Sequence, residues 1–171
     1  KTIEYLVKNG DDVIVFCPEG SPDNYKGAKI VGVAAMPLPL YPELKLGLPG
    51  AAVSEALEEF KPDLIHVVNP AVLGLGGIWL AKTNNIPLIA SYHTHLPKYL
   101  EYYGMGMLEP LLWELLKAAH NQALLNLCTS TAMVTELESK GIRRTALWQR
   151  GVDTNSFKPE YRNQTMRAKL L

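Results

Sequence analysis

The residues best suited to chemistry follow a short apolar segment in the middle of the chain. Residues 86–90 read Ile-Pro-Leu-Ile-Ala, which predicts a buried strand, and residues 91–95 read Ser-Tyr-His-Thr-His. Pro97 prevents the strand from continuing much further. In open parallel sheets, ligands bind outside the carboxyl ends of the strands. We therefore predict a ligand site at this strand end, lined by Tyr92, His93, Thr94 and His95.

His93 and His95 allow three interpretations. Their i, i+2 spacing places both rings on one side of the sheet if the strand continues through them. A metal site would need further ligands, and no cluster of Cys, Asp or Glu lies nearby in the sequence. A purely structural role is the second interpretation. We favour the third, a substrate-binding or catalytic role, because an imidazole can donate a hydrogen bond to a hydroxyl group near neutral pH.

Three more polar residues are candidates for substrate binding. Asn69 follows the predicted buried strand 63–68, Tyr99 lies shortly after the two histidines, and Arg150 lies in a turn after the last predicted strand. His66 lies within the strand 63–68 between apolar residues, and we interpret it as a core or cleft-lining histidine.

Three glycines, Gly74, Gly76 and Gly77, lie in the helix predicted after strand 63–68. They do not match the Gly-x-Gly-x-x-Gly fingerprint of dinucleotide-binding folds, which also needs an acidic residue about 20 positions further on. We therefore expect them to allow close packing of the helix on the sheet.

The segment Tyr99–Met107 reads YLEYYGMGM and is rich in Tyr and Met. Its two glycines argue against a rigid helix. A mobile lid, an ordinary packed turn and a membrane-docking loop are all consistent with this composition. Aromatic side chains favour membrane–water interfaces, and Lys98 and Lys117 flank the segment. Peripheral membrane contact is therefore one of the hypotheses for this segment.

Strand-like and helix-like segments alternate along the chain. The predicted strands are apolar along most of their length, as is typical of parallel strands buried on both faces. This alternation predicts an α/β fold with a doubly wound parallel sheet and helices on both faces. The predicted strands are 12–17, 29–34, 63–68, 86–90, 123–128 and 146–148, the predicted helices are 1–9, 52–60, 71–84, 108–120 and 130–140, and a Pro-rich loop is predicted for 36–42.

Composition excludes some classes of function. The 171-residue chain carries 17 basic and 17 acidic residues, so its formal net charge is zero and nucleic acid is not a favoured partner. No apolar run approaches the roughly 18 residues of a membrane-spanning helix. The two cysteines, Cys17 and Cys128, are predicted to be buried thiols in a reducing compartment.

The two ends of the chain predict its domain organisation. The helix at 1–9 has no N-cap and no preceding strand, so we expect that a first strand of the domain is missing. From Asp153 onward the sequence turns polar. We expect a Rossmann-like domain over 1–152, and a linker with the start of a second, missing domain over 153–171.

Several motifs in order carry a resemblance to a known family. They are Pro-Asp-Leu-Ile-His at 62–66, Tyr-His-Thr at 92–94, the strand–Ser–helix segment 127–137, and Gly-Val-Asp at 151–153 followed by Phe157-x-Pro159. The chain resembles the retaining glycosyltransferases of family 4, whose GT-B architecture places two Rossmann-like domains across a cleft. Within that family, residues 91–99 and the turn 150–153 look closest to the sulfoquinovosyl transferases.

The resemblance implies a division of labour between two domains. This chain would be the acceptor-side domain, inactive alone, and the missing domain would bind most of the nucleotide-sugar donor. Transfer would be retaining and metal-independent, with no cofactor, and the leaving phosphate would take the acceptor proton. His93 would be the catalytic residue, orienting hydroxyl groups and stabilising charge beside the transferred sugar.

The subfamily likeness implies the substrates and the location. The donor would be UDP-sulfoquinovose and the lipid acceptor diacylglycerol, in glycolipid biosynthesis. The location would be cytoplasmic, with peripheral contact to the inner or photosynthetic membrane. Mannosyl- and glucosyl-transferases of the same family share most of these motifs and remain alternatives. A non-catalytic α/β ligand-binding module could use the same strand edge, whereas a GT-B epimerase would need carboxylates facing the cleft, and residues 91–99 contain none.

Overall fold

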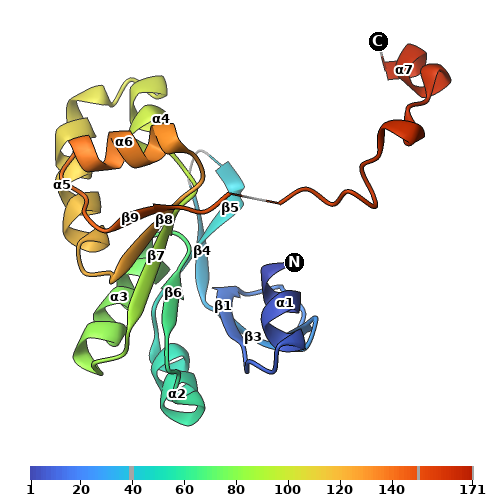
Figure 1. Ribbon diagram of the computed structural model, residues 1–171. Helices are drawn as coiled ribbons and strands as arrows, with labels where there is room; N and C mark the ends of the chain where they lie inside the picture. Colours follow the sequence, from blue (N-terminus) through green and yellow to red (C-terminus); the bar gives the residue numbers. More distant parts are fainter. Residues whose placement is uncertain (39–40, 150, 171) are drawn as a thin grey trace.

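The computed structural model describes residues 1–38, 41–149 and 151–170. Its central feature is a four-stranded parallel sheet in the order β6-β7-β8-β9 (Figure 1). The strands are β6 (Ile65–Val67), β7 (Leu88–Tyr92), β8 (Leu125–Cys128) and β9 (Thr145–Leu147). Ser91 and Tyr92 of β7 pair with Leu127 and Cys128 of β8. Because the strands are parallel, their carboxyl ends lie at one edge, and the polar residues after β7 lie there too.

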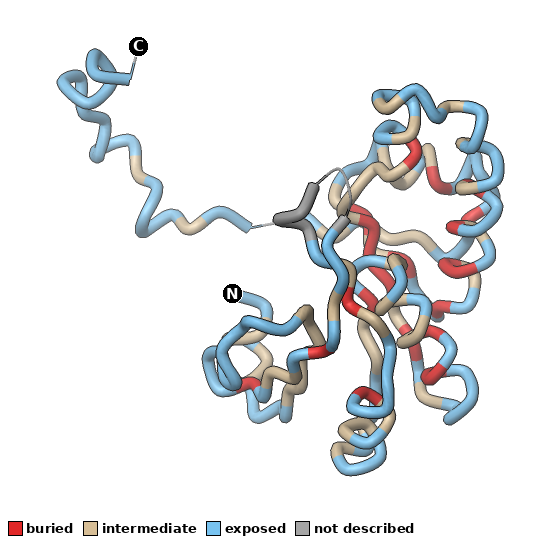
Figure 2. The backbone as a smooth tube through the Cα atoms, turned by 180° about the vertical axis from the view of Figure 1, so that it is seen from behind, coloured by how far each residue is buried: buried red, intermediate tan, exposed pale blue. Residues whose placement is uncertain are grey.

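Three helices connect these strands and pack against one face of the sheet. They are α3 (Val72–Thr83), α5 (Glu109–His120) and α6 (Thr131–Ser139). Val67 of β6 and Ala90 of β7 are buried in one cluster with Ile78 of α3, and Figure 2 shows that the buried residues concentrate in this part of the molecule. Because strand side chains alternate, His66 and Ser91 face the opposite side of the sheet, which we call the open face.

The N-terminal part of the chain forms two smaller sheets. In the first, β3 (Ala28–Val33) pairs in parallel with β1 (Ile14–Pro18) and antiparallel with β2 (Asn24–Tyr25). In the second, β4 (Ala35–Leu38) pairs antiparallel with β5 (Tyr41–Gly47). The loop predicted for 36–42 is therefore wrong for its described residues, while 39 and 40 lie outside them. Both strands of a two-stranded sheet are edges, where a proline without an N–H group is tolerated.

The remaining helices lie around these sheets. They are α1 (Thr2–Lys8), α2 (Ala51–Phe60), α4 (Leu96–Tyr102) and α7 (Gln164–Leu170), with short 3-10 helices η1 (Gly106–Leu108) and η2 (Pro159–Tyr161). Ser130 caps α6 as expected, because its hydroxyl accepts a hydrogen bond from the backbone N–H of Met133. Residues 151–170 extend away from the sheets and are nearly all exposed (Figures 1 and 2).

The packing of α3 on the sheet depends on glycine, as the sequence predicts. A Cβ atom built at Gly74 would overlap the carbonyl oxygen of Asn69, and one at Gly76 would overlap Pro49. A Cβ atom at Gly77 would lie 3.4 Å from the nearest atom of Val67, which is an ordinary contact. The first turn of α3 therefore lies directly against the loop that follows β6.

The predicted α/β class, a Rossmann-like domain with a parallel sheet and connecting helices, is confirmed. The division at residue 152 and the expected first strand stay predictions. β1 and β6 each lie at the end of their own sheet, so each has an outer edge with no paired strand in the described part of the chain.

Candidate functional site

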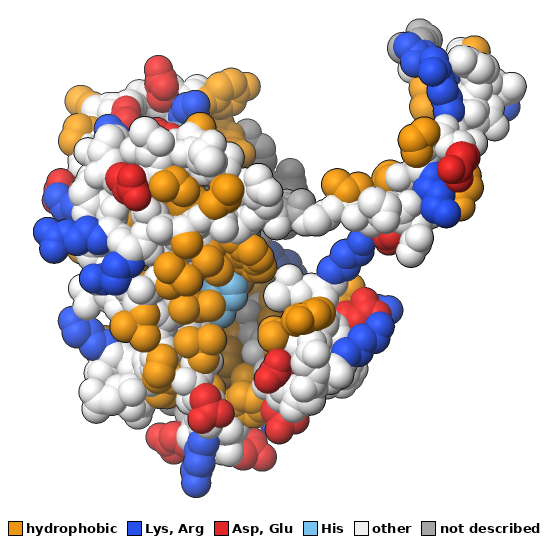
Figure 3. Space-filling model, in the orientation of Figure 1, with side chains coloured by type: hydrophobic (Ala, Val, Ile, Leu, Met, Phe, Trp, Pro, Cys, Tyr) orange, Lys and Arg blue, Asp and Glu red, His pale blue; other side chains and the backbone are white. Residues whose placement is uncertain are grey.

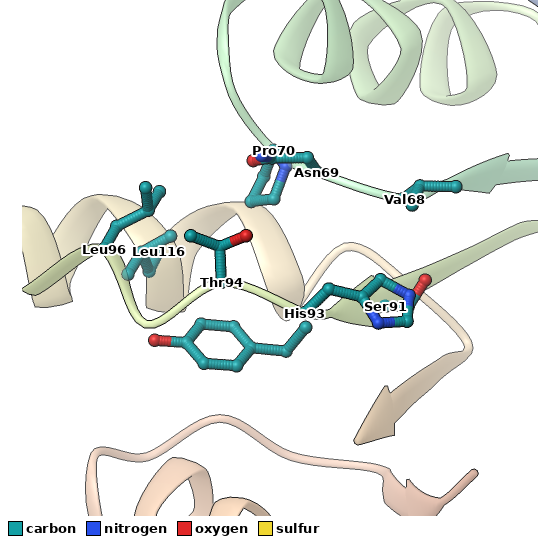
Figure 4. Close-up of a pocket in the computed structure, with 9 residues that line it drawn as sticks. Val68, Asn69, Pro70, Ser91, His93, Thr94, Leu96 and Leu116 are labelled. Carbon is teal, nitrogen blue, oxygen red and sulfur yellow. The ribbon is translucent and has the colours of Figure 1, made fainter. Parts of the chain in front are cut away.

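A small recess lies at the carboxyl edge of the four-stranded sheet, where the sequence predicts a site. The loop after β6 (residues 68–70), the end of β7 with its continuation (residues 91–94), Leu96 of α4 and Leu116 of α5 line it. Figure 4 shows Thr94 pointing across the recess toward the side formed by Asn69 and Pro70. Four predicted site residues come together here: Asn69, Tyr92, His93 and Thr94. Amide, imidazole and hydroxyl groups beside an apolar wall suit a ligand with hydroxyl groups and an apolar part.

The two histidines do not share one side of the sheet, because β7 ends at Tyr92 instead of continuing through them. His95 is the N-cap of α4, and its Nδ1 atom accepts a hydrogen bond from the backbone N–H of Lys98 at 3.3 Å. With Nδ1 accepting, Nε2 carries the ring proton and donates it to Oε1 of Glu136 at 2.8 Å. Both ring nitrogens of His95 are thus used within the domain, and its role in substrate binding stays a prediction.

Tyr92 lies beneath the recess rather than at its surface. Its side chain is 3% exposed and packs with Trp113 and Leu116 of α5 and Leu137 of α6. Burial, and then the Glu136 carboxylate, raise the pKa of the Tyr92 hydroxyl, so it stays protonated at neutral pH. Within the described residues this hydroxyl is buried without a hydrogen-bond partner. The ring therefore shapes the recess, and a contact between the hydroxyl and a substrate stays a prediction.

His93 belongs to a cluster of three aromatic rings and one hydroxyl group on the open face. Nε2 of His66 lies 2.6 Å from Oγ of Ser91, which is fully buried. The ring centroid of Trp148 lies 5.8 Å from that of His66 and 5.9 Å from that of His93. Burial, and then the neighbouring His93, lower the pKa of His66, so its imidazole is neutral at pH 7. We call these four residues the His66 cluster.

The sequence gives only part of this cluster. His66 pairs with Ile89 of β7, and strand alternation places Ser91 on the same face as Ile89, whereas His93 lies just past the end of β7. No sequence pattern links Trp148 to them. Trp148 meets these residues only because of the strand order and the position of its backbone. Its N–H donates a hydrogen bond to the carbonyl of Cys128 at the end of β8, at 2.7 Å. Figure 3 shows hydrophobic side chains gathered around a histidine on this side of the molecule.

Tyr99, another predicted site residue, does not line the recess, because it lies on α4 and is exposed. Arg150 lies outside the described residues, so its predicted role stays a prediction. The expectation that Tyr99–Met107 lacks a rigid helix is wrong for its first part, because α4 continues to Tyr102. Gly104, with a φ of +70°, follows the helix and so terminates it rather than weakening its interior.

The described residues contain no group of three or more His, Cys, Asp or Glu side chains placed to hold a metal ion. Among their helices, none is long and apolar enough to cross a bilayer. Both cysteines are free thiols, and the predicted burial is confirmed for Cys128, whereas Cys17 is half-buried. Burial raises the pKa of the Cys128 thiol.

The fold and the recess together define a class of protein. A parallel α/β sheet with polar side chains at its carboxyl edge is typical of Rossmann-like domains, which bind their ligands at such an edge. A comparison with family models gives a match to the family described as Glycosyltransferase Family 4 over residues 1–156. The chain belongs to glycosyltransferase family 4.

Curated relatives agree with this family. Sulfoquinovosyl transferase SQD2 of Arabidopsis thaliana is 37% identical, over 98% of this chain and 34% of the relative. A GDP-mannose-dependent alpha-mannosyltransferase of Mycobacterium tuberculosis is 33% identical, over 99% of this chain and 46% of the relative. An alpha-monoglucosyldiacylglycerol synthase of Streptococcus pneumoniae is 33% identical, over 60% of this chain and 24% of the relative. The chain thus spans less than half the length of each of these relatives.

Proposed function

We propose that this chain is the acceptor-side domain of a retaining glycosyltransferase that transfers a sugar from a nucleotide-sugar donor to a lipid. The proposed donor is UDP-sulfoquinovose and the proposed acceptor is diacylglycerol. The observation that carries this choice is the 37% identity to sulfoquinovosyl transferase SQD2 over 98% of the chain. A second domain, beginning within 153–171, would bind most of the donor.

The recess supports an acceptor site of this kind. Thr94 and Asn69 offer hydrogen-bonding groups on its two sides, while Leu96 and Leu116 form an apolar wall. An acceptor with one reactive hydroxyl group and apolar chains needs both features. His93 follows Tyr92 in the lining and lies on the side of Thr94 away from the two leucines (Figure 4), where it would hold the acceptor hydroxyl for attack.

The proposed reaction needs no metal ion and no cofactor. The acceptor oxygen attacks the anomeric carbon from the side on which the bond to the diphosphate breaks. The acceptor proton passes to the leaving diphosphate oxygen, so the products are the glycolipid and the nucleoside diphosphate. His93 donates a hydrogen bond to a hydroxyl group in this scheme and fixes its orientation, which lowers the barrier mainly by positioning.

A donor assay tests the proposal and separates it from its closest alternative. The polypeptide that joins this chain to its donor-binding domain should transfer sulfoquinovose from UDP-sulfoquinovose to diacylglycerol. Because the proposed reaction is metal-independent, turnover should continue in the presence of a metal chelator. The 171-residue chain should show no turnover. GDP-mannose is the matched control, because the mannosyltransferase relative is 33% identical over 99% of the chain. Turnover with GDP-mannose alone would replace the sulfolipid assignment by mannosyl transfer.

An exposed apolar surface around α4, η1 and α5 supports contact with the membrane that holds such an acceptor. These three elements pack against one another. Leu108 is the N-cap of α5, and Leu111 and Leu115 follow it on α5 at helical spacing; they are 44%, 60% and 59% exposed. We call these three residues, together with the exposed Tyr99, Tyr102, Met105 and Met107, the apolar ridge. Figure 3 shows hydrophobic side chains exposed at this end of the molecule.

Binding of the apolar ridge to lipid should depend on apolar burial more than on charge, because Glu101, Glu109 and Glu114 lie among its residues. Replacing Leu111 and Leu115 together by serine should reduce the fraction of protein bound in vesicle co-sedimentation about tenfold. Vesicles of phosphatidylcholine alone should bind nearly as well as anionic ones. Equal binding of the double variant and the parent protein would contradict membrane contact through this surface.

A further inference from the structure

The hydrogen bond between His66 and Ser91 fixes the tautomer of a histidine that has no assigned role. Ser91 is fully buried, and the partner of its hydroxyl among the described residues is Nε2 of His66, at 2.6 Å. A buried hydroxyl proton needs an acceptor, so Ser91 donates to Nε2. The single proton of the neutral imidazole then lies on Nδ1. The ring of His66 therefore has one orientation and one tautomer.

The indole of Trp148 connects this fixed ring to His93. Its centroid lies at nearly equal distances from the two imidazoles, 5.8 Å and 5.9 Å, and both ring pairs are tilted, with interplanar angles of 52° and 58°. The backbone of Trp148 is itself held by its hydrogen bond to Cys128. A rigid bicyclic ring in contact with both imidazoles limits the rotamers that either can adopt.

We propose that His66, held by Ser91, is a positioning residue for His93, and that Trp148 transmits this order from one imidazole to the other. The inference rests on the proposed function, in which His93 orients a hydroxyl group of the substrate. A displacement of about 1 Å at such a group can cost up to about a hundredfold in rate. His66 and Trp148 thus affect transfer without contact with the reacting atoms.

A double-mutant cycle in the polypeptide that includes the donor-binding domain separates positioning from general support of the fold. His66→Leu and Trp148→Leu should each lower kcat about tenfold, with KM for the donor changed less than about twofold. In a His93→Ala background, neither should lower kcat further, because the group they position is gone. His66→Gln should restore part of kcat, since its amide can still bond to Ser91. Leu125→Ala, on the same sheet face but outside the cluster, is the matched control and should leave kcat unchanged.

A second measurement on the 171-residue chain does not depend on turnover. The chain has four histidines, so the imidazole nitrogens can be assigned by ¹⁵N NMR. His66 should show the Nδ1–H tautomer, and Ser91→Ala should convert it to a mixture of the two neutral tautomers. Trp148→Leu should change the ¹⁵N chemical shifts of His93, whereas Leu125→Ala should not. Unchanged His93 signals in Trp148→Leu, or equal losses of kcat with and without His93, would overturn the inference. If these signals shift but the longer polypeptide transfers no sugar, the coupling stands and the proposed function fails.

Discussion

Replacing His93 by alanine is expected to lower kcat of the complete glycosyltransferase about a hundredfold or more, with a small change in KM. The imidazole lies in the recess beside Thr94, and the proposed reaction places the acceptor hydroxyl and the transferred sugar there. In other acyl- and group-transfer enzymes, removing a hydrogen-bond donor that is already oriented toward the developing charge lowers kcat by about a hundredfold or more. Steady-state kinetics with UDP-sulfoquinovose and diacylglycerol would measure it.

His93→Gln is the informative partner variant, because a glutamine amide keeps a hydrogen-bond donor near the position of the imidazole. We expect it to recover part of the lost kcat, and we expect circular dichroism to show the parent fold in both variants. A kcat within twofold of the parent enzyme for His93→Ala would remove His93 from the mechanism. The recess would then be a binding surface without a catalytic histidine.

The largest effect on stability is expected for Gly74→Ala. The added Cβ would overlap the carbonyl oxygen of Asn69, which is backbone and cannot rotate away. Either α3 must move off the sheet or the loop after β6 must shift, so we expect a loss of about 2 kcal/mol or more in the free energy of unfolding. Urea unfolding of the 171-residue chain would measure it. Since Asn69 lines the recess, ligand affinity should fall as well.

Gly77→Ala provides a control within the same helix. Its Cβ would make only an ordinary contact with Val67, at 3.4 Å, and alanine favours a helix interior over glycine by about 0.5–1 kcal/mol. This variant should therefore be as stable as the parent chain or slightly more stable. Equal destabilisation by both substitutions would show that the close approach at Gly74 is not the cause.

The positions of the elements in the chain were mostly predictable, and their ends were less so. The strand predicted over 86–90 runs over Leu88–Tyr92 instead, because Ser91 and Tyr92 pair with Leu127 and Cys128 of β8. Pairing with a neighbouring strand thus overrides the apolar boundary that the sequence suggests. The β4–β5 pair was missed for a similar reason, since two prolines at an edge read locally as a loop.

What the sequence determined by itself is the class of fold, the strand edge that carries His93 and the membership in glycosyltransferase family 4. Apolar periodicity and short ordered motifs are local properties, and a single chain displays them without a structure. The tertiary structure decided which polar side chains meet. It turned His95 toward Glu136 of α6 and brought Trp148 against His66 and His93, 82 and 55 residues away along the chain. Such contacts depend on strand order and on where β7 ends, and neither leaves a pattern in the residues involved.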